Sequence, residues 1–175
     1  AKVLVLGFFM NNILPARAGE LVRAHVGAKV TGEKRTLVLA TIATGTQAAP
    51  LTNQQIFEQF NLVVFNNSNS SSHVDGRSFI GGNLSGGDYV QHPGAVAPSN
   101  YTGLTILGNA SGNIHVNGLG AVVARNASNL TVNTGNAVVF GNVNNSSFNG
   151  SGSYYVGGSA NNSTLNTHRD ASLAT

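Results

Sequence analysis

The sequence predicts a mainly β protein, a β-solenoid or β-helix-like stack with rungs of 16–17 residues, preceded by a short helical or mixed N-terminal segment. Two observations favour this fold. NASGNIHVNGLGAVVAR (109–125) is followed at once by NASNLTVNTGNAVVFG (126–141), which repeats its order of apolar residues and asparagines. Gly, Asn and Ser separate the short apolar runs, as tight corners require. One such unit cannot bury its apolar side alone, whereas stacked units can.

Composition and charge divide the 175 residues into a segment at 1–50 and a solenoid body at 51–175. The segment carries six Lys or Arg against two acidic residues, a balance of +4, whereas the body carries three against four, a balance of −1. A nearly neutral body argues against nucleic-acid binding. The absence of cysteine excludes disulfides and thiolate metal sites.

The N-terminal segment supports three interpretations, which the sequence leaves open. Basic residues, the apolar run RTLVLATIA (35–43) and TQAAP (46–50) resemble a signal peptide that is removed on export. The run is too short to span a bilayer as a helix. Alternatively, the segment caps the body, or it docks into a neighbouring subunit. Residues 14–30 place apolar side chains on one side at helical spacing, at Leu14, Ala18, Leu21, Val22, Val26 and Val30.

The body is expected to begin with a short helix and to continue as about six rungs. LTNQQIFEQF (51–60) predicts a helix capped by Thr52 or Asn53, with Ile56, Phe57 and Phe60 facing a core. Residues 83–108 form one longer unit, in which NLSGGDYV and LTILG are strands and QHPGAVAPSN is a loop. The regular units are expected at 66–82, 109–125, 126–141, 142–158 and 159–175.

Alignment of the units predicts one ladder of corner residues and two core columns. The corner ladder consists of Asp75, Asn117, Asn133, Asn149 and Asn166, whose side chains are expected to turn the chain and to stack. One core column holds Val74, Val116, Val132, Phe148 and Leu165, and the other holds Val123, Val139 and Tyr155. An antiparallel sandwich is the alternative, but it would not require the same residue type at the same phase.

Two stretches resemble known families. The motifs NLVVF (61–65), VDGR (74–77) and GGN (81–83) give residues 51–166 a resemblance to the choice-of-anchor A domain of secreted bacterial surface proteins. That resemblance implies an exported surface or matrix protein, adhesive in some relatives. Separately, residues 11–43 resemble a motif of flippase-like membrane proteins related to lysylphosphatidylglycerol synthases, through NNILPARAGELVRA and TLVLATI. This second resemblance implies a composite or wrongly extended N-terminus, and no function follows from it.

Catalytic chemistry is not indicated by the sequence. The body has only four carboxylates, Glu58, Asp75, Asp88 and Asp170, and they fall in different units. Asp75 is interpreted as a turn residue that pairs with Arg77. The five histidines lack metal-ligand spacing, and His115 falls in an outward column with Thr131, Ser147 and Thr164. We therefore expect no enzyme activity, no catalytic or metal-binding residues and no cofactor.

The expected function is that of a non-catalytic structural or adhesive protein, secreted to the bacterial surface or extracellular matrix. Its partner would be a second copy of itself, joined through the solenoid ends or the N-terminal segment into filaments, or an extracellular glycan or a host or matrix protein. The alternative is a flat face that binds a glycan or, less favoured, ice. Exposed aromatic candidates for glycan binding are Tyr89, Tyr101, Tyr154 and Tyr155.

Overall fold

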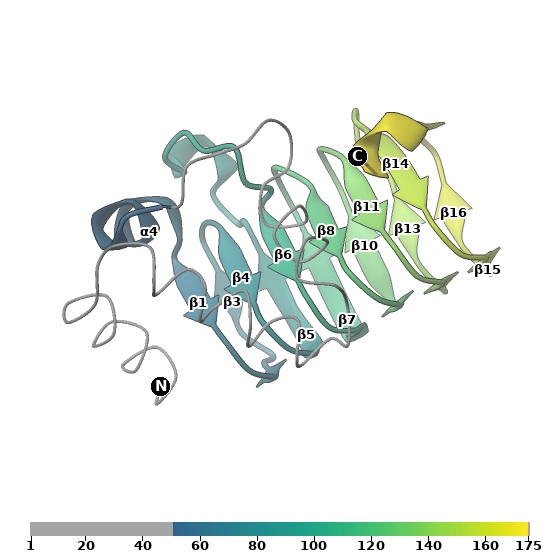
Figure 1. Ribbon diagram of the computed structural model, residues 1–175. Coiled ribbons are helices and arrows are strands. Elements are labelled where there is room, and N and C mark those ends of the chain that lie inside the picture. The colour runs from purple at the N-terminus through teal and green to yellow at the C-terminus, as the bar shows by residue number, and fades with distance from the viewer. Residues whose placement is uncertain (1–50, 175) are drawn as a thin grey trace.

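A computed structural model describes residues 51–174, which form a β-solenoid of parallel strands (Figure 1). The predicted β-solenoid is thereby confirmed, with seven turns instead of six. The predictions made for residues 1–50, a helical or mixed segment that is a leader, a cap or a docking segment, lie outside the described residues. Each turn passes through two sheets. Sheet A has seven strands, in the spatial order β1 (Leu62–Val64), β4 (Ser78–Ile80), β6 (Leu104–Ile106), β8 (Ala121–Val123), β11 (Ala137–Val139), β14 (Ser153–Val156) and β17 (His168–Arg169).

Sheet B forms the other side of each turn and contains ten strands. It bends in the middle, where Asn129 and Asn145 adopt positive φ of 54° and 48°. Asparagine tolerates this left-handed region better than most residues do. The strands are β2 (Ser68–Asn69), β3 (His73–Val74), β5 (Leu84–Tyr89), β7 (Ala110–Val116), β9 (Ala127–Ser128), β10 (Leu130–Val132), β12 (Val143–Asn144), β13 (Ser147–Phe148), β15 (Ala160–Asn161) and β16 (Thr164–Leu165).

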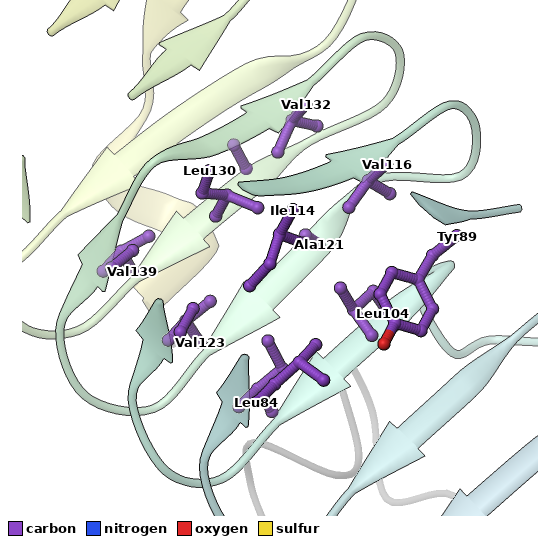
Figure 2. Packing of buried hydrophobic residues seen from close by; sticks show 14 of the residues in the cluster. Leu84, Tyr89, Leu104, Ile114, Val116, Ala121, Val123, Leu130, Val132 and Val139 are labelled. Carbon is purple, nitrogen blue, oxygen red and sulfur yellow. The ribbon is translucent and has the colours of Figure 1, made fainter. Parts of the chain in front are cut away.

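The core lies between the two sheets and is filled by one column of side chains after another (Figure 2). In sheet B, parallel register brings Val116 beside Val132, and Val132 beside Phe148. In sheet A, Val123 lies beside Val139. Successive rungs lie about 4.8 Å apart, so each column buries its apolar surface continuously along the solenoid. The first predicted core column is in register throughout, with Tyr89 inserted between Val74 and Val116.

Two tyrosines lie differently from the prediction. Val139 pairs with Val156, so Val156 continues the second core column and Tyr155 instead pairs with Val138 on the outer side of sheet A. The cause is one extra residue in the turn before β14, and a shift of one residue reverses the face of a strand. Tyr89, expected as an exposed aromatic, is fully buried.

A helix and a loop cover the first turns of the solenoid. Helix α4 (Asn53–Gln59) begins with a capping box between Thr52 and Gln55. Its Phe57 is 64% exposed, so the prediction that this side chain faces a core was wrong. The β5–β6 connection, which contains η1 (Pro93–Ala95), contacts the helix region through the rings of Tyr101 and Phe60, 5.3 Å apart. At the other end lies η2 (Ala171–Ala174).

Candidate functional site

The outer side of sheet B carries two straight columns of small polar side chains, which we call the polar face. Inward positions such as Leu84 and Val116 alternate with these outward ones. The parallel pairing aligns the outward residues rung by rung. One column holds Asn69, Ser85, Ser111, Ser128, Asn144 and Asn161, where Ser111 and Ser128 follow the paired Ala110 and Ala127, and the other holds His73, Asp88, His115, Thr131, Ser147 and Thr164.

Two histidine–aspartate pairs lie at the first rungs of this face. His115 Nδ1 is 2.8 Å from Asp88 Oδ1, and His92 Nδ1 is 2.9 Å from Asp75 Oδ1. His73 lies beside Asp88 in the strand register. Both pairs are open to solvent, so they contribute little to stability. They place ionisable hydrogen-bonding groups at one end of a face that otherwise presents hydroxyls and amides.

Asp75 occupies neither of its two predicted places. Its partner is His92, not Arg77. It is also separated from the asparagine ladder. Val74 pairs with Tyr89, and Tyr89 pairs with Val116. The residue after Tyr89, which is Val90, therefore lies between Asp75 and Asn117. Val90 is fully buried and has a positive φ of 57°.

Arg77 fastens the long loop instead. Its Nε donates to the Tyr101 carbonyl at 2.9 Å, and its Nη1 donates to the Ala97 carbonyl. The residue is nearly inaccessible to solvent, and this burial lowers the pKa of its guanidinium. The arginine therefore holds two carbonyls of the loop with charge-assisted hydrogen bonds.

The other four predicted ladder residues form a continuous chain of side-chain amides. Asn133 Nδ2 donates to Asn117 Oδ1 at 2.9 Å, Asn149 Nδ2 to Asn133 Oδ1 at 3.5 Å, and Asn166 Nδ2 to Asn149 Oδ1 at 3.2 Å. We call this row the amide ladder. It runs along the corner where sheet B ends, beside the second outward column of the polar face.

A second row of asparagines, which was not predicted from the sequence, lies at the opposite corner. Here each Oδ1 accepts a hydrogen bond from the backbone N–H of the corresponding residue on the next rung. The first bond runs from the Asn83 N–H to Asn67 Oδ1 at 2.8 Å, and the last runs from the Ser159 N–H to Asn142 Oδ1 at 2.9 Å. We call this row the carbonyl ladder. Its acceptors are Asn67, Asn83, Asn109, Asn126 and Asn142. The sequence did contain a signal for this row. In each of these turns, an asparagine directly precedes the first strand that belongs to sheet B.

The carboxylates of the described residues do not gather into one catalytic group. Glu58 accepts from Gln54 within α4, and Asp170 accepts from the Ser172 hydroxyl and backbone N–H. These bonds lower the pKa of Asp170. Among residues 51–174, no group of three or more His, Cys, Asp or Glu is placed to hold a metal ion. The polar face presents hydroxyls and amides, with the His–Asp pairs at its first rungs.

Comparison with known proteins points to adhesion. Residues 53–137 match the family model described as "Putative Ice-binding-like adhesive domain". The matched range runs from the start of α4 to the first residue of β11 and includes the first rungs of the polar face. No curated protein and no solved structure matches the chain. No finding supports the choice-of-anchor A or flippase-like resemblance.

The match supports the coarser part of the functional expectation, an adhesive domain, and an adhesive domain suggests a surface or extracellular location. Within the part of the chain that the structure describes, no helix has the length and hydropathy needed to cross a membrane.

Proposed function

We propose that this chain is a non-catalytic adhesive domain of the bacterial surface or matrix, and that it attaches to an extracellular glycan through the polar face. The observation that carries the proposal is the register of the two outward columns, which repeat small polar groups on successive strands. Such groups stand about 4.8 Å apart along the solenoid. A rigid, repeating array suits a repeating polar ligand, because little conformational entropy is lost on binding.

The side chains of the polar face favour a hydrated glycan over ice. Ser, Thr and Asn both donate and accept hydrogen bonds, as sugar hydroxyls do. The Asp88–His115 pair interrupts the second column with ionisable groups, which hold water in their own geometry. The two columns contain no Phe, Tyr or Trp, so hydrogen bonds rather than stacking on large rings would supply the affinity on this face.

End-to-end assembly is a second candidate, supported by the strand edges of the last rung. Among the described residues, β15, β16 and β17 each pair with a neighbour on one side only. An unpaired edge is a template for a strand of another chain. Negative-stain microscopy at high protein concentration tests this directly, since regular fibres would support assembly and monodisperse particles would exclude it.

The glycan proposal is tested by pull-down of the full chain with insoluble cellulose, chitin and peptidoglycan. A bulky side chain in the middle of the polar face, Ser128→Tyr or Thr131→Tyr, is expected to reduce retention at least tenfold. Ser151→Tyr, at an exposed turn between β13 and β14, is the matched control and should bind like the unsubstituted chain. Failure to bind any of the three polysaccharides, or full binding by the face variants, would overturn the proposal. Selective retention on ice would instead favour the ice alternative.

A further inference from the structure

Two of the four residues of the amide ladder are followed directly by glycine. Asn117–Gly118 lies before β8 and Asn149–Gly150 lies before β14, and the sequence contains no other Asn–Gly pair. Because glycine has no Cβ, its backbone nitrogen approaches the preceding side chain with little steric hindrance. In such a pair the nitrogen can attack the side-chain amide carbon of the asparagine intramolecularly. The two sites share this chemistry but differ in their surroundings.

The β5–β6 loop encloses the first site. A Cβ atom placed on Gly118 would lie 2.5 Å from Pro93 Cβ and 3.1 Å from Val90 Cγ1, so both side chains already lie against this glycine. Gly118 is buried, and Asn117 is only partly exposed. The side chain of Asn117 is also held by Asn133, whose Nδ2 donates to its Oδ1 at 2.9 Å. Attack on the amide carbon needs rotation of this peptide, which these contacts oppose.

The turn between β13 and β14 leaves the second site open. The Asn149 side chain is exposed, and its Nδ2, which must leave, donates to Asn133 Oδ1 at 3.5 Å, the longest bond of the amide ladder. The Gly150 N–H, which must attack, donates to no acceptor among residues 51–174. Asn166 Nδ2 donates to Asn149 Oδ1 at 3.2 Å. A hydrogen-bond donor therefore already faces the oxygen on which negative charge develops during the attack.

We propose that Asn149 is a site of spontaneous modification, at which the asparagine is converted to aspartate or isoaspartate. The Gly150 nitrogen forms a bond to Cγ of Asn149, the Cγ–Nδ2 bond breaks, and ammonia leaves with the proton of the Gly150 nitrogen. Water then adds to either carbonyl of the resulting succinimide ring and opens it. The net reaction consumes one water and releases one ammonia, so it needs no oxidant or reductant.

The modification interrupts the amide ladder. The new carboxylate cannot donate to Asn133 Oδ1, and it places a negative charge beside that oxygen. An isoaspartate also adds a methylene group to the main chain in the turn before β14, where the length of the turn sets the register of the strand. The last rungs of the solenoid should therefore be less stable in the modified chain.

Peptide mapping by mass spectrometry tests the site, because Asn117 and Asn149 fall in different tryptic peptides, on either side of Arg125. During incubation of the full chain at mildly alkaline pH, aspartate and isoaspartate should accumulate at Asn149 at least tenfold faster than at Asn117. In concentrated urea the two rates should become similar, because the fold no longer separates the sites. Equal rates in the folded chain would overturn the proposal. So would a preference for Asn149 that persists in urea, since the flanking sequence would then be its cause.

A second measurement follows stability during the same incubation. The urea midpoint of the unsubstituted chain should fall toward that of Asn149→Asp as the product accumulates. Asn149→Gln is the matched control, because its longer side chain does not form the succinimide ring, and its midpoint should stay constant. An equal fall in Asn149→Gln would overturn the proposal, because damage elsewhere would then explain the loss. Neither measurement uses a glycan, so both stand apart from the proposed function.

Discussion

The side chain of Asn133 donates a hydrogen bond to Asn117 Oδ1 at 2.9 Å and accepts one from Asn149 Nδ2 at 3.5 Å. One amide thus links three successive rungs and uses both its donor and its acceptor. Ladders of this kind align neighbouring turns, because a slip by one residue would break a bond on each side. The amide ladder therefore helps to set the register that builds the polar face.

Replacement of Asn133 by Asp is expected to destabilise the chain by about 1–3 kcal/mol. The carboxylate cannot donate to Asn117 and places a negative charge beside its Oδ1. Urea unfolding followed by circular dichroism measures the change. Asn166→Asp is the control, since Asn166 is exposed and makes only one ladder bond, to Asn149. A loss as large at Asn166 as at Asn133 would contradict a cooperative ladder.

In the carbonyl ladder, by contrast, replacement of an asparagine by aspartate should have little effect on stability. Oδ1 of Asn126 accepts the Asn142 backbone N–H at 2.8 Å, a role that a carboxylate oxygen can also fill. Asn126→Asp is therefore expected to change the unfolding free energy by less than about 0.5 kcal/mol, whereas Asn126→Ala should lower it by about 1–2 kcal/mol, because a backbone donor loses its partner. The same urea titrations measure both variants. Equal effects of Asp and Ala would show that the acceptor is not what stabilises this corner.

The sequence predicted the amide ladder better than the carbonyl ladder, for a physical reason. Asn117 and Asn133 each follow an inward valine. The same spacing therefore recurs in both an apolar and a polar column, which makes the repeat easy to recognise in the sequence. The asparagines of the carbonyl ladder are difficult to distinguish in the sequence from the many other asparagines. The 26-residue spacing from Asn83 to Asn109, which includes the long β5–β6 loop, also interrupts their repeat. Tyr155 was misplaced because its unit is one residue longer between β11 and β14, which shifts the phase of the strand.

Other differences depend on contacts between distant segments. The sequence places Arg77 two residues from Asp75, yet its guanidinium donates to loop carbonyls 20 and 24 positions further along the chain. The burial of Leu107, Val122 and Val138 was equally unpredictable, because strand alternation assigns them to the outside. Local periodicity predicts which residues share a face. It does not predict which contacts a side chain makes with residues far along the chain.

Removal of the Arg77 side chain should release the β5–β6 loop. Arg77→Ala leaves the Tyr101 and Ala97 carbonyls without their donor, so residues 91–103 should exchange amide hydrogens faster and be cut sooner by protease. Hydrogen exchange followed by mass spectrometry measures this segment separately from the rest. Arg125→Ala, at a partly exposed corner, is the control. Unchanged protection of residues 91–103 would show that the loop is held by other contacts.

Tyr89 should make stability depend on pH in the alkaline range. Burial, and secondarily the Asp88 carboxylate, raise the pKa of Tyr89 to about 12 from 10.0, and its hydroxyl donates to the Gly86 carbonyl at 3.2 Å. Between pH 10 and 12 the unfolded chain would release this proton while the folded chain keeps it. The contribution of Tyr89 to stability is therefore fully present below pH 10. It falls as pH rises, by on the order of 2 kcal/mol for this group.

The variant Tyr89→Phe lacks this titration, so the stability advantage of the unsubstituted chain over the variant should shrink or reverse between pH 10 and 12. Urea midpoints at pH 9, 10, 11 and 12 measure it, and a constant difference would contradict the raised pKa.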